Sequence, residues 1–214
     1  EGVKRTTAIN ANILITTIPA FTLAIAIVLR RERASAAKVI GILCAAAGAL
    51  YLIGLDRLRL DPTTAFGNAL IVCNTSLYAV YLVLSKRLLE RYHPVTVVTY
   101  VFLFGALLVA PFGVAALRDV HFATQPPAVL IGLAYIVVFP SILAYYLSVW
   151  ALRRTASSLV AMYVYLQPLI TAVGAPLILH ERVTARASLA AALIFVGLAL
   201  ATWGEQRGGR ALGA

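Results

Sequence analysis

The sequence predicts an all-α integral membrane protein with about seven transmembrane helices. Of its 214 residues, 62% are hydrophobic and only 12% are charged, and the mean hydropathy is +0.92. Soluble domains contain about 25% charged residues, so this composition indicates the membrane class. The second observation is the spacing of the charges, which leaves seven uncharged windows of 17 to 31 residues. In chain order these windows are 6–29, 39–55, 62–85, 94–117, 122–152, 155–179 and 187–204.

Each window is close to the length that a membrane helix needs. A helix requires roughly 20 apolar residues to cross the hydrocarbon core of a bilayer. The window at 39–55 is the shortest, and we expect its helix to include a few flanking residues. A water-soluble helix would carry charges every few residues on its solvent face, and none of the windows does.

The net charge of +10 belongs to the loops between these windows. Alternate loops hold eleven Lys and Arg residues on one side and seven on the other. The positive-inside rule therefore predicts that the eleven-residue side and the C-terminus are cytoplasmic, in the inner membrane of a cell. Basic charge distributed in this way favours a lipid bilayer as the partner and does not indicate a nucleic-acid surface.

The sequence contains an internal repeat at a shift of 149 residues, which places 6–54 onto 155–203. Both copies have Pro in mid-window, Glu-Arg in the following loop and Gly in the next window. Equivalent helices are five windows apart in chain order, an odd number, so the two copies cross the membrane in opposite directions, as in secondary transporters. We expect this chain to be the remnant of a ten-helix (5+5) protein that lacks about 80 residues and three helices. The expected parts are two helices of a first repeat (1–58), a complete second repeat (62–206) and a cytoplasmic tail (207–214).

A series of short motifs resembles the EamA family of the drug/metabolite transporter superfamily. The motifs run from Asn74 to Tyr81, from Pro140 to Tyr145 and from Ala151 to Ser157, and continue with Gln167-Pro168 and the Leu179–Arg182 turn. No single motif is specific, but their order and spacing cover nearly the whole chain as helices four to ten of ten. The resemblance implies an exporter of amino acids, metabolites or drug-like solutes.

Polar side chains recur at helical spacing within the windows, where they need a partner or water. We expect them to line a substrate cavity, although hydrogen bonds between helices would produce the same stripes. The cavity candidates are Asn74, Tyr78, Tyr81, Ser141, Tyr145, Tyr163, Gln167, Thr171, Asn12 and Thr16. Three mid-window prolines, Pro19, Pro140 and Pro168, lie beside these stripes and are expected to kink their helices and free a backbone carbonyl.

Other functions find less support in the sequence. The windows contain no His, Asp or Glu, so an intramembrane enzyme lacks its base or metal ligands, and neither a metal nor a cofactor is expected. Glu32 and Glu181 are preserved by the repeat, and their place at window ends favours a solvated or ion-paired position over proton relay. Small residues every four positions from Ala37 to Ala49 indicate close helix packing, within the chain or in a homodimer. A truncated, non-transporting membrane protein or scaffold remains the alternative function.

Overall fold

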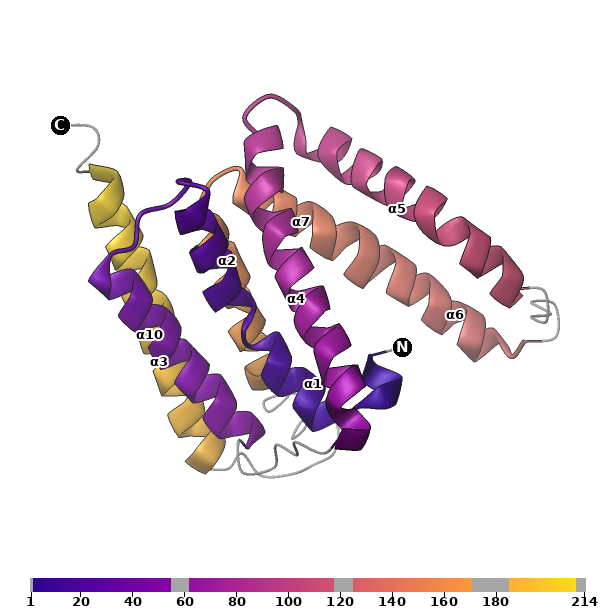
Figure 1. Ribbon diagram of the computed structural model, residues 1–214, viewed down its shortest axis with the longest axis horizontal. Helices are drawn as coiled ribbons and strands as arrows, with labels where there is room; N and C mark the ends of the chain where they lie inside the picture. The colour runs from indigo at the N-terminus through magenta and orange to yellow at the C-terminus, as the bar shows by residue number, and fades with distance from the viewer. Residues whose placement is uncertain (1, 55–61, 118–124, 171–184, 211–214) are drawn as a thin grey trace. The chain divides into compact units, whose positions relative to one another are not determined.

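The computed structural model describes residues 2–54, 62–117, 125–170 and 185–210, and these residues form helices and their connecting turns (Figure 1). Within these ranges, six helices are long and apolar enough to cross a membrane, and a shorter apolar helix covers Ser157–Ile170. The six are Asn10–Val28, Ala36–Ile53, Pro62–Leu88, Pro94–Val114, Pro127–Leu152 and Ala187–Gln206. They fall in the predicted windows, and the protein is an all-α, multi-pass membrane protein.

The helix starts follow from local sequence. Helices α4 (Pro62–Leu88), α5 (Pro94–Leu117) and α6 (Pro127–Ile136) each begin at a proline. Proline suits the first helical position because its fixed φ is already helical and its missing N–H would have no partner there. Helix α3 (Ala36–Ile53) instead begins after Ser35, whose hydroxyl accepts a hydrogen bond from the backbone N–H of Lys38 at 3.2 Å.

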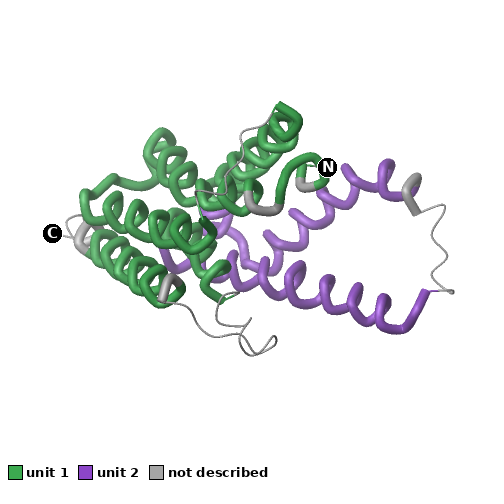
Figure 2. The backbone as a smooth tube through the Cα atoms, turned by 90° about the horizontal axis from the view of Figure 1, so that it is seen from below, with its two compact units in different colours: residues 1–84, 156–214 green, residues 85–155 purple. Residues whose placement is uncertain are grey.

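The described chain divides into two compact units, which Figure 2 shows in different colours. Unit 1 consists of residues 1–84 and 156–214, and unit 2 consists of residues 85–155. Besides most of α4, unit 1 contains α1 (Ala8–Ile15), α2 (Ile18–Val28), α3, α8 (Ser157–Met162), the 3-10 turn η5 (Tyr163–Tyr165) and α10 (Ala185–Arg210).

Helices α3 and α10 form the closest pairing in unit 1 and run antiparallel along each other (Figure 1). A Cβ atom on Gly197 would lie 2.5 Å from the amide N of Ala45 and from the carbonyl O of Gly41. Only glycine permits this approach, since real Cβ atoms do not come so near to another backbone. The small residues that the sequence analysis identified therefore pack within the chain, and Ala45 and Ala49 are fully buried.

Helices α2 and α8 pack together beside this pair and complete the core of unit 1. Leu23 of α2, Ile42 of α3, Met162 of α8 and Ile194 of α10 belong to one buried cluster. Burial of apolar surface inside a membrane gains little over lipid contact, so close packing of these side chains is what holds the helices together.

Unit 2 is a hairpin built from the last residues of α4, α5, α6, the π-helix η4 (Val137–Leu143) and α7 (Ala144–Leu152). The chain enters unit 2 at Ser85 and leaves it at Thr155. These two ends are joined by Lys86, whose Nζ donates to the carbonyl O of Thr155 at 2.7 Å. Phe102 of α5 meets Tyr145 of α7 edge to face, with ring centroids 5.2 Å apart. Most apolar side chains of α5 and α6 are exposed, which is expected of surfaces that face lipid or further membrane helices.

Candidate functional site

The first membrane crossing is broken beside Pro19. Helix α1 ends at Ile15 and α2 begins at Ile18, with Pro19 in its first turn. Thr16 and Thr17 bridge the break, and their hydroxyls donate to the carbonyls of Ile13 and Leu14, each at 2.6 Å. Thr16, a cavity candidate, is thus buried and bonded to its own helix, whereas Asn12 is exposed.

A second irregular segment surrounds Pro140 in unit 2, where the chain forms η4 in place of regular α-helix. Proline cannot donate to the carbonyl four residues before it, here that of Ile136. The hydroxyl of Ser141 donates to this carbonyl at 3.1 Å and so satisfies it within the helix. Tyr145 lies one turn later and is half-buried against Phe102.

The third irregular segment contains Tyr163 and comes just before Gln167 and Pro168. After α8 the chain tightens into η5, and regular helix resumes at Leu166. Tyr163 and Gln167 are exposed, whereas Tyr165 between them is fully buried. Thr171 lies outside the described residues.

The cavity candidates of α4, Asn74, Tyr78 and Tyr81, lie partly at the surface of unit 1. Asn74 is exposed, and Tyr78 and Tyr81 are half-buried with their ring centroids 5.7 Å apart. The two rings are tilted against each other, and their contact is favourable because aromatic pairs prefer centroid separations of 4.5–7 Å.

The cavity candidates are therefore distributed over both units. Unit 1 holds seven described candidates, and unit 2 holds two, Ser141 and Tyr145. The seven are Asn12, Thr16, Asn74, Tyr78, Tyr81, Tyr163 and Gln167. Within unit 1 the structure brings Tyr78 and Tyr81 into contact. The assignment of these residues to a substrate cavity remains a prediction.

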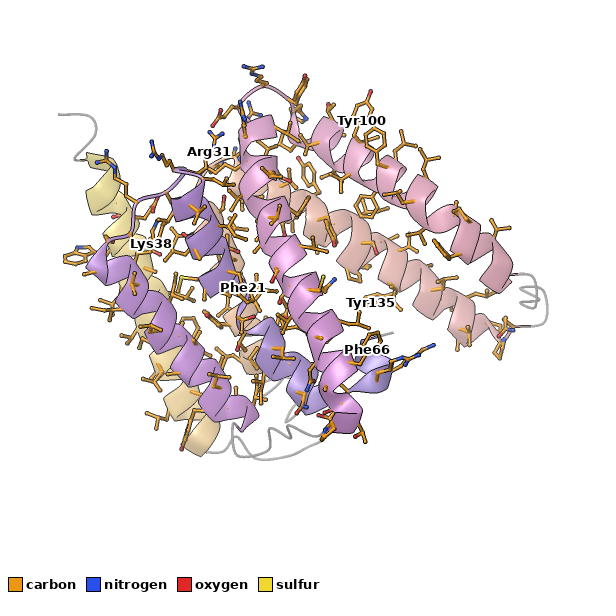
Figure 3. All side chains as sticks on the ribbon, in the orientation of Figure 1. Phe21, Arg31, Lys38, Phe66, Tyr100 and Tyr135 are labelled. Atoms are coloured by element: carbon orange, nitrogen blue, oxygen red, sulfur yellow. The ribbon has the colours of Figure 1, made fainter. Side chains whose placement is uncertain are left out.

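A buried charged cluster lies at the end of unit 1 where α2 stops and α3 starts, and the sequence analysis did not assign it a function. Lys38 lies in the first turn of α3 (Figure 3). Its Nζ lies 3.0 Å from Glu32 Oε2 and also pairs with the carboxylate of Glu205. The side chains of Lys38 and Glu32 are only 2% and 4% exposed, whereas that of Glu205 is 35% exposed. Glu32 is therefore ion-paired, and the solvated alternative considered above is wrong.

Glu32 also completes the start of α8, 126 residues further along the chain. The residue before α8 is Ala156, whose side chain cannot cap a helix. Glu32 Oε1 accepts from the backbone N–H of Ser158 at 3.1 Å, and its Oε2 accepts from the Ser158 hydroxyl. A carboxylate at this point satisfies free N–H groups and interacts favourably with the helix dipole.

We expect Ser158→Ala to destabilise the protein by about 2 kcal/mol, because it removes a buried hydrogen bond to a charged acceptor. Chemical unfolding in detergent micelles measures this change. Ser188→Ala, at an exposed position of α10, is the matched control and should change stability by less than about 0.5 kcal/mol. Equal stability of the two variants would show that the Glu32–Ser158 contact contributes nothing.

The opposite end of unit 1 holds a polar network whose described members, Thr6, Asn10, Thr64 and Asn68, are uncharged side chains. Asn10 of α1 is fully buried, and its Nδ2 donates to Asn68 Oδ1 of α4 at 3.4 Å. The hydroxyl of Thr6 donates to the same oxygen, and Asn68 Nδ2 lies 3.5 Å from Thr64 Oγ1. The sequence analysis missed Asn10 and Asn68, and the i, i+4 spacing of Asn12 and Thr16 pointed to a different face of α1.

The chain is similar in sequence to one family of transporters and to individual proteins of archaea and bacteria. The sequence profile of the EamA-like transporter family matches residues 1–54 and 65–203. An uncharacterized transporter of Archaeoglobus fulgidus is 31% identical over 202 residues, which are 94% of this chain and 69% of that protein. The uncharacterized transporter YetK of Bacillus subtilis is 28% identical over 184 residues, which are 84% of this chain and 55% of YetK.

A solved crystal structure of another protein has the same fold. It aligns with a TM-score of 0.79 at 20% identity, over 96% of this chain and 71% of that protein. This chain thus spans 55% to 71% of the length of these three proteins.

Proposed function

Because the chain belongs to the EamA-like transporter family, we propose that it acts as a secondary transporter exporting a small organic solute by alternating access. The solute class is an amino acid, another metabolite or a drug-like molecule. The protein would reside in the inner membrane with its C-terminus in the cytoplasm, as the distribution of Lys and Arg favours.

The observation that carries this proposal is the reciprocal contact between α3 and α10. A Cβ atom on Gly41 would lie 2.6 Å from Gly197 O, and one on Gly48 would lie 2.9 Å from Ala190 O. The shift of 149 residues carries Gly41 to Ala190 and Gly48 to Gly197, so each contact is the image of the other. A local two-fold axis produces such reciprocity, and it supports two inverted repeats divided at 1–58 and 62–206.

A hydrogen bond at the centre of this seam supports the same symmetry. Cys44 Sγ donates to the carbonyl O of Leu193 at 3.4 Å, and these two residues are themselves 149 positions apart. In inverted-repeat transporters the substrate site lies near the midplane where the repeats meet, often beside broken helices. The segments around Pro19 and Pro140 and the 3-10 turn before Pro168 are breaks of this kind, and in the sequence they lie beside the cavity candidates.

The polar groups of the proposed cavity favour a neutral or zwitterionic solute. Tyrosine hydroxyls and the amides of Asn74 and Gln167 can both donate and accept hydrogen bonds, and they carry no charge. A polyanionic solute would require basic residues within the uncharged windows, and the sequence places its Lys and Arg outside them.

We expect Tyr78→Ala and Tyr145→Ala each to lower the transport rate of a confirmed solute by about tenfold, through the loss of one hydrogen bond and of ring contacts. Uptake into proteoliposomes measures the rate. Tyr92→Ala is the matched control, because Tyr92 is exposed beyond the end of α4. Unchanged transport in both cavity variants would refute the cavity, and no transport of any solute by the intact chain would favour the scaffold alternative.

A further inference from the structure

The buried charged cluster joins two pairs of helices at one end of unit 1. Glu32 follows α2 and caps α8, and these two helices pack on each other. Lys38 lies in the first turn of α3 and pairs with Glu205 of α10, and these two helices share the glycine seam. The ion pair between Glu32 and Lys38 therefore connects the α2–α8 pair to the α3–α10 pair.

The two pairs differ in how regular their helices are. The α3–α10 pair is continuous and held backbone to backbone, so its members have little freedom to separate. The other pair contains the break at Thr16–Thr17 and the 3-10 turn at Tyr163–Tyr165. Such irregular segments absorb backbone rotation more easily than regular helix, so relative movement is expected between the pairs.

The repeat places no cation at the position equivalent to Lys38 and no hydroxyl at the position equivalent to Ser158. A shift of 149 residues carries Lys38 to Ala187 and Ile9 to Ser158, so both the cation and the hydroxyl are missing from the counterpart. Ala187 is 5% exposed and has no charge to offer a carboxylate. Glu181 and Asp56, the counterparts of Glu32 and Glu205, lie outside the described residues. The neutral Asn10–Asn68 network occupies the other end.

We propose that Glu32, Lys38, Ser158 and Glu205 form a one-sided latch that keeps the Glu32 end of the transporter closed. This inference rests on the proposed alternating access. Separating the pairs at this end exposes an ion pair that is nearly inaccessible to water and removes the cap of α8. Among the described residues, separation at the other end breaks the hydrogen bonds that the neutral side chains of Thr6 and Asn10 make to Asn68. Such bonds are about half as strong as hydrogen bonds to charged groups. The resting protein is thus biased toward opening away from the latch.

Backbone hydrogen–deuterium exchange tests the latch without requiring a substrate. The intact chain is placed in lipid nanodiscs, and exchange is measured by mass spectrometry in peptides covering 29–38, 156–162 and 8–15. In Glu32→Gln we expect exchange at 29–38 and 156–162 to rise at least about tenfold, with no change at 8–15. Glu205→Gln should give a smaller rise of about threefold, because Glu205 is partly exposed and the ion pair between Lys38 and Glu32 remains in this variant.

Glu90→Gln, at an exposed position after α4, is the matched control and should leave all three peptides unchanged. Faster exchange in all three peptides of Glu32→Gln would indicate general destabilisation and overturn the latch, as would unchanged exchange at 29–38. The proposed transport is judged separately by solute uptake. A protein that transports but shows no localised exchange retains its proposed function and loses the latch.

Discussion

Gly197→Ala is expected to destabilise the protein by about 3 kcal/mol, because its new methyl group would meet the backbone of α3. The Cβ atom would lie 2.5 Å from both Ala45 N and Gly41 O, and neither atom belongs to a side chain that could turn away. Helices α3 and α10 would have to separate along their whole contact. The lower thermal unfolding temperature in detergent would measure this loss.

Gly105→Ala provides the matched control, since it introduces the same methyl group into the interior of α5. No described atom lies within 4 Å of the Cβ position there. Alanine is a better helix former than glycine, so the control should be neutral or up to about 1 kcal/mol more stable. Indistinguishable unfolding temperatures for the two variants would mean that the seam is looser than the contacts indicate.

Lys38→Met should have the second large effect, a loss of about 3 kcal/mol, because it leaves the buried carboxylate of Glu32 without its cation. Methionine retains most of the apolar volume of the lysine stem, so the loss reports the charge. Lys4→Met, at an exposed position of the N-terminal turn, should cost less than about 0.5 kcal/mol. Unfolding by denaturant in micelles measures both variants.

Adding Glu32→Gln to Lys38→Met should recover part of the lost stability, since the double variant has no unpaired buried carboxylate at Glu32. The coupling between the two substitutions is expected to exceed about 1 kcal/mol. Additive losses in the double-mutant cycle would show that the two side chains act independently, against the ion pair at 3.0 Å.

The membrane crossings could be predicted closely because charge alone marks their ends. The windows at 62–85 and 94–117 correspond to helices Pro62–Leu88 and Pro94–Leu117. The window at 6–29 correctly located a crossing but concealed two helices, since the break at Thr16–Thr17 leaves no signature in charge or hydropathy. Pro19 marks its position, whereas Pro111 lies within an unbroken α5, so proline by itself does not fix where a helix ends.

The polar contacts were harder to predict because they depend on partners distant in sequence. In the sequence Lys38 looks like any loop charge, because it lies between two uncharged windows. It is buried only because α10 and the segment after α2 pack against it. Asn10 and Asn12 are equally polar, and the position of Asn68, 58 residues away from Asn10, decides which of them is bonded within the protein. Periodicity shows that a helix has a polar face, but the neighbouring helices determine what that face contacts.

The capping of α8 by Glu32 has a consequence for how the protein is made. The chain emerges from the ribosome from its N-terminus, so Glu32 and Lys38 are synthesised well before Ser158 and long before Glu205. Until those residues arrive, the early pair lies at the bilayer surface, where water and lipid headgroups solvate its charges. Burial of the pair is thus a late event of biogenesis, completed only when the last helix has been inserted beside α3.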